Sequence, residues 1–328
     1  MGTRDPPSTL RFCPVNKGVS AFKTLFRWCG FLGIRSAMTL PDCITIQEPT
    51  PGYPVLVINH PAATARVALH GAHVMEWQPA GQAQPVLYMS PEALLEHDKA
   101  IRGGIPICWP WFGGHPTDAT KPMHGFARIR SWELVRADAQ EGHVAMLFKL
   151  ESNEETHALW PHDFRCHLGI SFGAALEVSL MSENTGETSF QLTEALHTYL
   201  TVGDIKQVTV RGLTEASYLD TVGDRTMREQ EGDITFDGEV DRQYTSSAGV
   251  IVEDRSLGRN LVVNKLGSGT TVVWNPWIEK SKRLADLPDE AYHGFLCVEA
   301  ANAGDAAVTV MPGGRHVLLT QISLPTVV

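Results

Sequence analysis

Apolar and polar residues alternate along most of the chain from about residue 40 onward. Large apolar residues recur at every second position from Val144 to Leu150, which is the period-two pattern of a half-buried strand. The longer stretch 166–182 alternates in the same way and places six apolar side chains on one face. These are Leu168, Ile170, Phe172, Leu176, Val178 and Leu180. The pattern predicts strands in both stretches.

Glycine and proline mark the expected turns between strands. Residues 261–265 and 270–274 flank Leu-Gly-Ser-Gly, and residues 308–311 and 316–322 flank Pro-Gly-Gly, so each pair predicts a hairpin. Helical periodicity is confined to short segments near 91–99 and 154–160. No internal repeat, low-complexity tract or interdomain linker interrupts the pattern. The chain is therefore expected to be all-β, with a large antiparallel sandwich as its architecture and few short helices.

The first 38 residues differ from the rest of the sequence. Six basic residues and one acidic residue precede Met38, and the segment lacks strand alternation. We expect residues 1–38 to be a flexible or weakly helical extension, and residues 39–328 to form a single domain. The alternative is a targeting segment, although Arg27 and Arg35 leave only a short apolar run between them.

Bulk composition excludes several classes of function. The formal net charge of −10 argues against nucleic acid or an anionic membrane as the main partner. No run approaches the roughly 18 apolar residues of a membrane span. Six cysteines without a CxxC pair favour reduced thiols in the cytoplasm over a disulfide framework. In an acidic protein, an anionic substrate would need a locally basic pocket. Arginines inside sequence motifs are therefore the candidates for binding such a substrate.

Four segments combine titratable residues and glycines in a strand-rich chain. They are 100–113, which contains Arg-Gly-Gly-Ile-Pro, then Met-His-Gly-Phe-Ala-Arg at 123–128, Glu-Ala-Leu-His-Thr-Tyr at 194–199 and Cys-Val-Glu-Ala at 297–300. In this order they resemble the hexose-6-phosphate mutarotase branch of the aldose 1-epimerases. The resemblance covers residues 40–325 and includes 69–74, 160–164 and 274–277. It implies the galactose mutarotase-like form of the β-sandwich.

Strand geometry places two of these residues without help from the resemblance. In 191–202, His197 lies on the odd face with Ala195 and Tyr199, away from the apolar even face. In 295–299, Glu299 shares a face with Cys297, opposite two apolar residues. A lone strand histidine is more often structural than catalytic, but a carboxylate on an apolar strand needs a partner or a purpose.

The resemblance assigns roles in anomer exchange, which needs an acid and a base with pKa values near neutrality. It implies that Glu299 is the base on the C1 hydroxyl and His197 the acid at the ring oxygen. The C1–O5 bond then breaks, and the open-chain aldehyde closes on its other face. His124 would orient the sugar, although a plain turn histidine is the alternative.

The phosphate would meet Arg102 and Arg128, whose planar guanidinium groups suit bidentate contacts. Structural ion pairs are the alternative for both arginines. The resemblance also implies that Asp220, a substrate-binding candidate, accepts from a sugar hydroxyl or holds an arginine. Met123, at a substrate-binding position, stands where relatives often have glutamine or a small polar residue.

No cofactor is implied, and no metal site either, since HExxH, paired CxxC and compact His/Asp clusters are missing from the sequence. Trp109, Trp111 and Phe112 could stack on a sugar or belong to the core. The expected protein is a cytoplasmic monomer acting on a small hexose 6-phosphate. Two alternatives stay open, namely an aldose 1-epimerase for unphosphorylated sugars and a non-catalytic carbohydrate-binding module.

Overall fold

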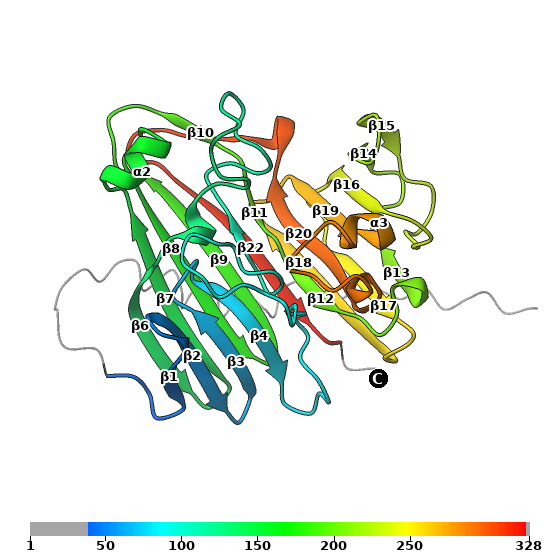
Figure 1. Cartoon of the computed structure of the whole chain (residues 1–328), viewed down its shortest axis with the longest axis horizontal. Helices are drawn as coiled ribbons and strands as arrows, with labels where there is room; N and C mark the ends of the chain where they lie inside the picture. The colour runs from blue at the N-terminus through cyan, green and yellow to red at the C-terminus, as the bar shows by residue number, and fades with distance from the viewer. Residues whose placement is uncertain (1–38, 326–328) are drawn as a thin grey trace, which may run out of the picture. The chain divides into compact units, whose positions relative to one another are not determined.

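Two long antiparallel sheets dominate the computed structural model, which describes residues 39–325 (Figure 1). The expected extension at 1–38 therefore lies outside the described residues. The first sheet has eight strands in the order β13-β17-β18-β22-β9-β8-β7-β6. Their bounds are Val208–Arg211, Val250–Asp254, Arg259–Leu266, Arg315–Ser323, Ala175–Asn184, Phe164–Gly173, His143–Glu151 and Glu133–Gln140.

The second sheet follows the order β15-β14-β16-β19-β20-β11-β5, and β12 also pairs with β20. These strands span Thr226–Glu229, Ser217–Asp220, Val240–Thr245, Thr270–Asn275, Phe295–Asn302, Glu194–Leu196, Ile107–Cys108 and, for β12, Tyr199–Thr201. Every pairing in both sheets is antiparallel.

Two smaller sheets complete the layers. β1 to β4 form one of them in sequence order, at Ile44–Thr50, Tyr53–His60, Ala63–Ala68 and His73–Pro79, and β10 pairs with β21 at Phe190–Leu192 and Val308–Val310. The helices α2 and α3 are short, at Glu154–Leu159 and Trp277–Ser281. Single 3₁₀ turns η1 to η4 lie at Ala127–Ile129, Ile205–Gln207, Ala291–Gly294 and Gly304–Ala306.

One large core fills the space between the layers. Val178 and Leu180 of the first sheet belong to the same buried cluster as Leu196 and Val298 of the second and Val74 of β4. β3 and β4 contact β8, and β20 contacts β18 and β22, which matches the overlap of blue and orange strands with the first sheet in Figure 1. The all-β sandwich expected from strand alternation is confirmed.

A second, smaller core covers the opposite face of the second sheet. Cys297, Trp274 and Tyr199 lie on this face, and the loop around Leu287 packs against them. In β20, Leu296 and Val298 belong to the large core while Phe295 and Cys297 belong to the small one. The second sheet therefore has two buried faces, and the two-residue period of the strand determines which side chains lie under the loops.

Several local expectations need correction. The 166–182 stretch is two strands, β8 and β9, joined by Ala174 and still sharing one apolar face. β18 and β19 are strands as expected but do not form a hairpin, because they belong to different sheets. β21 pairs with β10 rather than with β22. Residues 154–159 are helical, whereas 91–99 contains only isolated turns.

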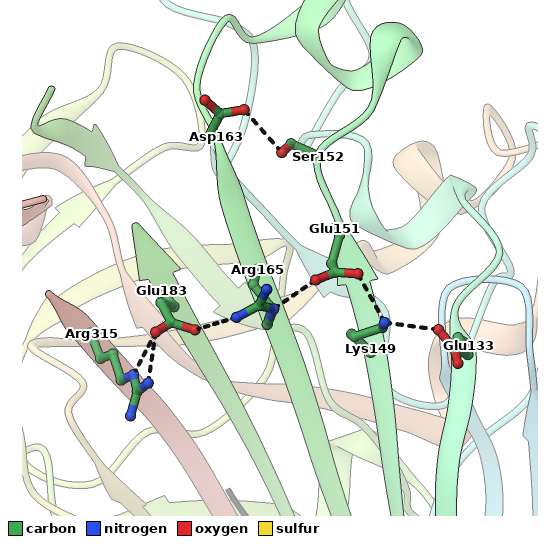
Figure 2. A network of polar contacts seen from close by, with 8 residues as sticks. All are labelled: Glu133, Lys149, Glu151, Ser152, Asp163, Arg165, Glu183 and Arg315. Carbon is green, nitrogen blue, oxygen red and sulfur yellow. Dashed lines mark hydrogen bonds and ion pairs between the residues drawn. The ribbon is translucent and has the colours of Figure 1, made fainter. Parts of the chain in front are cut away.

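Charged side chains of alternating sign run across the outer face of the first sheet (Figure 2). Arg315 pairs with Glu183 at 2.7 Å, Arg165 lies between Glu183 at 3.4 Å and Glu151 at 2.6 Å, and Lys149 follows at 2.8 Å from Glu151. The first four stand opposite one another on β22, β9, β8 and β7. Opposite charges at paired positions stabilise this strand order.

Candidate active site

His197 and Glu299 form a buried pair on the loop-covered face of the second sheet. His197 lies between β11 and β12, which both pair with the β20 strand that carries Glu299. The His197 Nε2 atom is 3.3 Å from Glu299 Oε1. His197 is 9% exposed and Glu299 1% exposed. The two residues that strand alternation placed away from the apolar core therefore lie in contact in the structure.

Three aromatic side chains fix the plane of the His197 ring. Tyr199 stacks on it with ring centroids 4.9 Å apart and planes inclined by 15°. Trp274 and His124 approach edge-on, with centroid distances of 5.8 and 5.9 Å. A ring held on several sides loses few rotamers when a ligand binds, so its nitrogens keep a fixed orientation.

The surroundings move the pKa values of the pair in opposite directions. Burial raises the pKa of Glu299 well above its usual range, the charge of Asp241 adds to this, and Arg128 opposes it. Burial lowers the pKa of His197 well below its usual range, and His124, Arg128 and Arg102 lower it further. Both shifts favour the uncharged form of the side chain, a protonated Glu299 and a neutral His197.

His124 lies in a strained turn beside the pair. Its backbone has a φ of +61°, which costs a residue other than glycine about 1–3 kcal/mol. Gly113 holds the turn from two sides, since its carbonyl accepts from the His124 amide at 2.6 Å and its own amide donates to His124 Nδ1 at 3.2 Å. Burial lowers the pKa of His124 to about 3, with smaller contributions from Arg128 and Arg102. The neutral ring therefore carries its proton on Nε2 and can donate a hydrogen bond from that atom.

The glycine after His124 is required by a close approach of the backbone. A Cβ atom on Gly125 would lie 2.0 Å from the carbonyl oxygen of Trp109, and its φ is +73°. That carbonyl accepts from the amides of Phe126 and Ala127 at 3.0 and 3.2 Å. The contact joins the His-Gly-Phe-Ala-Arg segment to the strand region that precedes it.

Arg128 brings an uncompensated positive charge to the site. Its Nη2 donates to the Met123 carbonyl at 2.8 Å, and its buried Nε has no hydrogen-bond partner. Within residues 39–325, no carboxylate lies within ion-pair distance of its guanidinium. Its charge nevertheless lowers the pKa of His197 and opposes the rise at Glu299. Such a guanidinium is suited to an anionic ligand.

Arg102 lies in the Arg-Gly-Gly turn and is held by two partners. Its Nε donates to Asp286 Oδ1 at 3.1 Å, and its Nη1 donates to the Tyr199 hydroxyl at 3.0 Å. The turn packs against backbone, because a Cβ on Gly104 would lie 2.1 Å from the Val74 carbonyl oxygen. The structure therefore places Arg102, Arg128 and His124 around the His197–Glu299 pair.

Asp220 is not brought to this group, contrary to expectation. The cross-strand register places it with Arg242, Val273 and Val298, on the core side of the second sheet and away from Glu299. It is 8% exposed and lies 3.5 Å from Arg228. The short Ser-Tyr-Leu-Asp match contained no information about register, which depends on strands far away in the sequence.

Met123 and the aromatic residues Trp109, Trp111 and Phe112 differ in how they are placed relative to the site. Met123 contributes its carbonyl to Arg128, while its own side chain is 57% exposed. Trp109 and Trp111 belong to the large core, so they are core residues rather than rings that stack on a sugar. Phe112 is only partly buried and meets His124 edge-on at 5.0 Å, so it borders the site.

The sequence reasoning missed two carboxylates near the site, Asp241 and Asp286. Asp241 is opposite Trp274 in the register, on the face that Glu299 occupies, and it pairs with Lys280 at 3.2 Å. Alternation within Val240–Thr245 could have assigned Asp241 to a face, but not to this site. Asp286 comes from a loop and has no local signal at all.

Neither metal ligation nor a membrane span is found in the described part of the chain. No group of three or more His, Cys, Asp or Glu side chains among residues 39–325 could hold a metal ion. No helix there is long and apolar enough to cross a membrane. The four cysteines in this part, Cys43, Cys108, Cys166 and Cys297, are free thiols.

The described residues form a β-sandwich with a buried His–Glu pair on one face of the second sheet. Comparison with known sequences gives the family to which this chain belongs. The sequence model of the aldose 1-epimerase family matches residues 54–323. The chain belongs to this family, and it is an isomerase. The expected family and enzyme class are thereby confirmed.

Individual relatives agree with this assignment. A protein of Escherichia coli (strain K12) with the name "Putative glucose-6-phosphate 1-epimerase" is 38% identical over 253 residues, which are 76% of this chain and 84% of that protein. A protein of Cenchrus ciliaris with the same name is 36% identical over 76% of this chain and 78% of its own length. A crystal structure of a "putative mutarotase" from Salmonella typhimurium has a TM-score of 0.82 at 31% identity and covers 92% of this chain and 99% of its own.

Proposed function

We propose that residues 39–328 form a catalytic domain that interconverts the α and β anomers of a hexose 6-phosphate, with glucose 6-phosphate as the main substrate. The observation that carries the proposal is a buried His–Glu pair with an uncompensated arginine beside it. The names of the relatives support the choice of sugar phosphate. Every proposed site residue comes from one chain, so a monomer suffices to form the site. We also propose that the enzyme acts in the cytoplasm.

Ring opening needs one proton taken from the C1 hydroxyl and one given to the ring oxygen. Glu299 takes the first and His197 gives the second, after which the C1–O5 bond breaks and the aldehyde forms. Rotation about C1–C2 and closure with reversed roles produces the other anomer. His124 donates a hydrogen bond from Nε2 that orients the sugar oxygen.

Substrate charge prepares the pair for this step. Burial favours a protonated Glu299 and a neutral His197, and the charges of Arg128 and Arg102 lower the pKa of His197 further. A phosphate dianion near Arg102 and Arg128 offsets their positive charge and favours an imidazolium. The proton then crosses the 3.3 Å contact, leaving Glu299 as carboxylate base and His197 as acid.

The rival within the family is an epimerase for unphosphorylated sugars. A neutral sugar gains little from a guanidinium without a counter-ion, whereas a phosphate gains a charge-assisted bidentate contact. The third possibility, a binding module without activity, does not need an acid and a base in contact. The arrangement therefore supports the phosphate-specific enzyme best.

Anomer exchange measured by NMR tests the proposal on glucose 6-phosphate, free glucose and free galactose. We expect kcat/KM to be highest for glucose 6-phosphate. We expect Arg128→Ala to lower the ratio of kcat/KM for glucose 6-phosphate to that for glucose about 10- to 100-fold, because one charge-assisted contact is lost. Arg255→Ala, at an exposed turn, is the control. Equal losses on both sugars would assign Arg128 to the sugar ring or the fold instead.

A further inference from the structure

The Arg102 guanidinium is fixed by a carboxylate from a distant loop. Asp286 Oδ1 lies 3.1 Å from both the Nε and the Nη2 atom of Arg102. The Tyr199 hydroxyl accepts from Nη1 at 3.0 Å. A guanidinium has five N–H donors, so donors on Nη1 and Nη2 stay available for a ligand while the group itself is held.

Asp286 is itself anchored to the chain next to Arg102. The Ser90 hydroxyl donates to the Asp286 carbonyl at 2.7 Å, and the Ser90 amide donates to the Arg102 carbonyl at 3.1 Å. Ser90 is buried. Arg102, Asp286 and Ser90 therefore form a closed circuit of backbone and side-chain bonds, which keeps the loop carboxylate in one place.

The two arginines of the site differ in charge balance. Arg102 and Asp286 together are close to neutral, whereas Arg128 has no carboxylate within ion-pair distance in residues 39–325. Attraction for an anion therefore comes mainly from Arg128. What Asp286 adds is orientation, because a free arginine side chain would lose several rotamers on binding.

Tyr199 connects this held guanidinium to the proton-transfer pair. Its hydroxyl accepts from Arg102, while its ring stacks on His197 at 4.9 Å. The separation between a phosphate on Arg102 and a ring oxygen near His197 is then set by one rigid aromatic side chain. A substrate must carry its phosphate at a matching distance from its anomeric centre.

We propose that Asp286 is a positioning residue that determines phosphate specificity by holding Arg102 in the orientation that a sugar 6-phosphate requires. This inference rests on the proposed function, since it explains how one of its two phosphate-binding residues is prepared. Asp286 acts through Arg102 and does not touch the substrate.

Steady-state anomer exchange on glucose 6-phosphate and glucose tests this in the full chain. We expect Asp286→Asn to raise KM for glucose 6-phosphate about tenfold, to change kcat by less than about twofold, and to lower selectivity over glucose about tenfold. Asp289→Asn, an exposed carboxylate three residues further along the same loop, makes the same charge change and is the control. Tyr199→Phe keeps the stacked ring and removes the other anchor of Arg102, so it should raise the same KM.

A double-mutant cycle separates positioning from general effects. If Asp286 acts through Arg102, Asp286→Asn changes nothing further in an Arg102→Ala background. Additive effects of the two changes overturn the inference, and so does a fall in KM, which would make Asp286 a competitor of the phosphate. An Asp286→Asn protein as selective as wild type, alongside an Arg128→Ala protein that has lost selectivity, overturns the inference alone. A wild-type enzyme without preference for glucose 6-phosphate overturns the proposed function as well.

Discussion

At the scale of single residues, the site depends on how burial moves the pKa values of His197 and Glu299 in opposite directions. Burial destabilises both ionised forms, so neither Glu299 nor His197 is charged at rest. In the proposed mechanism, transfer of the Glu299 proton to His197 creates a carboxylate base and an imidazolium acid together. A pair of titratable groups whose pKa values are pushed apart is typical of acid–base sites.

Removing either member of the pair should therefore stop the chemistry and spare the fold. We expect His197→Ala and Glu299→Gln each to lower kcat about 10²- to 10⁴-fold, the usual contribution of one positioned proton-transfer group. Far-UV circular dichroism checks the fold, and NMR anomer exchange gives the rate. His157→Ala, which removes an exposed histidine paired with Asp163, is the control. A variant with more than about half of the wild-type rate would exclude that residue from its role.

How far sequence could locate the site also depends on single residues. Period-two alternation placed His197 and Glu299 on faces that the structure brings together, because a strand's side chains alternate whatever its partners are. It could not place Asp220 or Asp241, since their faces relative to Glu299 depend on registers across β16 and β19. Asp286 reaches Arg102 from 184 residues away, and only folding shows that contact.

At the scale of elements, strands were easier to predict than their partners. The glycine-rich turn after β18 looks like a hairpin turn, but it carries the chain from the first sheet to the second. Gly267 has a φ of +65°, and a Cβ there would lie 1.9 Å from the Val317 carbonyl oxygen. Gly267 is needed because the backbone passes close to the Val317 carbonyl, not because it forms a tight hairpin. A glycine suits either situation, so the local sequence does not distinguish them.

The charged ladder of the first sheet gives a prediction at this scale. Glu183 is the best-buried carboxylate of the ladder, with a side chain 13% exposed, and it pairs with both Arg165 and Arg315 (Figure 2). We expect Glu183→Gln to lower the free energy of unfolding by about 1 kcal/mol, since two arginines lose one counter-ion. Urea denaturation at low and high salt checks this.

The salt dependence is the critical part of that experiment. The loss should shrink at high ionic strength, because the surface pairs are screened. Glu154→Gln, an exposed change at the start of α2, is the control for altering one carboxylate. A loss that is equal at both salt concentrations would mean that Glu183 packs rather than pairs.

At the scale of the whole domain, one buried ion pair joins the two long sheets. Glu194 of β11 lies 2.9 Å from His316 of β22, and Asn302 of β20 donates to the same Glu194 oxygen at 3.0 Å. Glu194 is fully buried. Isolated, such a carboxylate would be costly, so its partner from the opposite layer is part of what holds the layers together.

The His316 pair makes stability depend on pH. Burial lowers the pKa of His316, but the hydrogen bond and charge of Glu194 and the carbonyl of Gly267 outweigh it, so the net pKa is raised above the usual 6.5. A raised folded-state pKa means that the folded protein binds the proton more tightly than the unfolded chain. Its stabilising contribution is complete below about pH 6.5 and disappears as the pH rises through the folded-state pKa.

Unfolding free energies of wild type and His316→Gln, measured by urea denaturation across this range, test the linkage. We expect the wild type to exceed the variant most near about pH 6 and the difference to narrow steadily as the pH rises. His157→Gln, which removes an exposed pair, should show a much smaller pH-dependent difference because solvent screens it. Asn302 still donates to Glu194 in the His316 variant, so the domain should fold and the comparison can be made. If the difference instead grows with rising pH, His316 is neutral in the folded protein, and the sheets are joined by a hydrogen bond rather than by an ion pair.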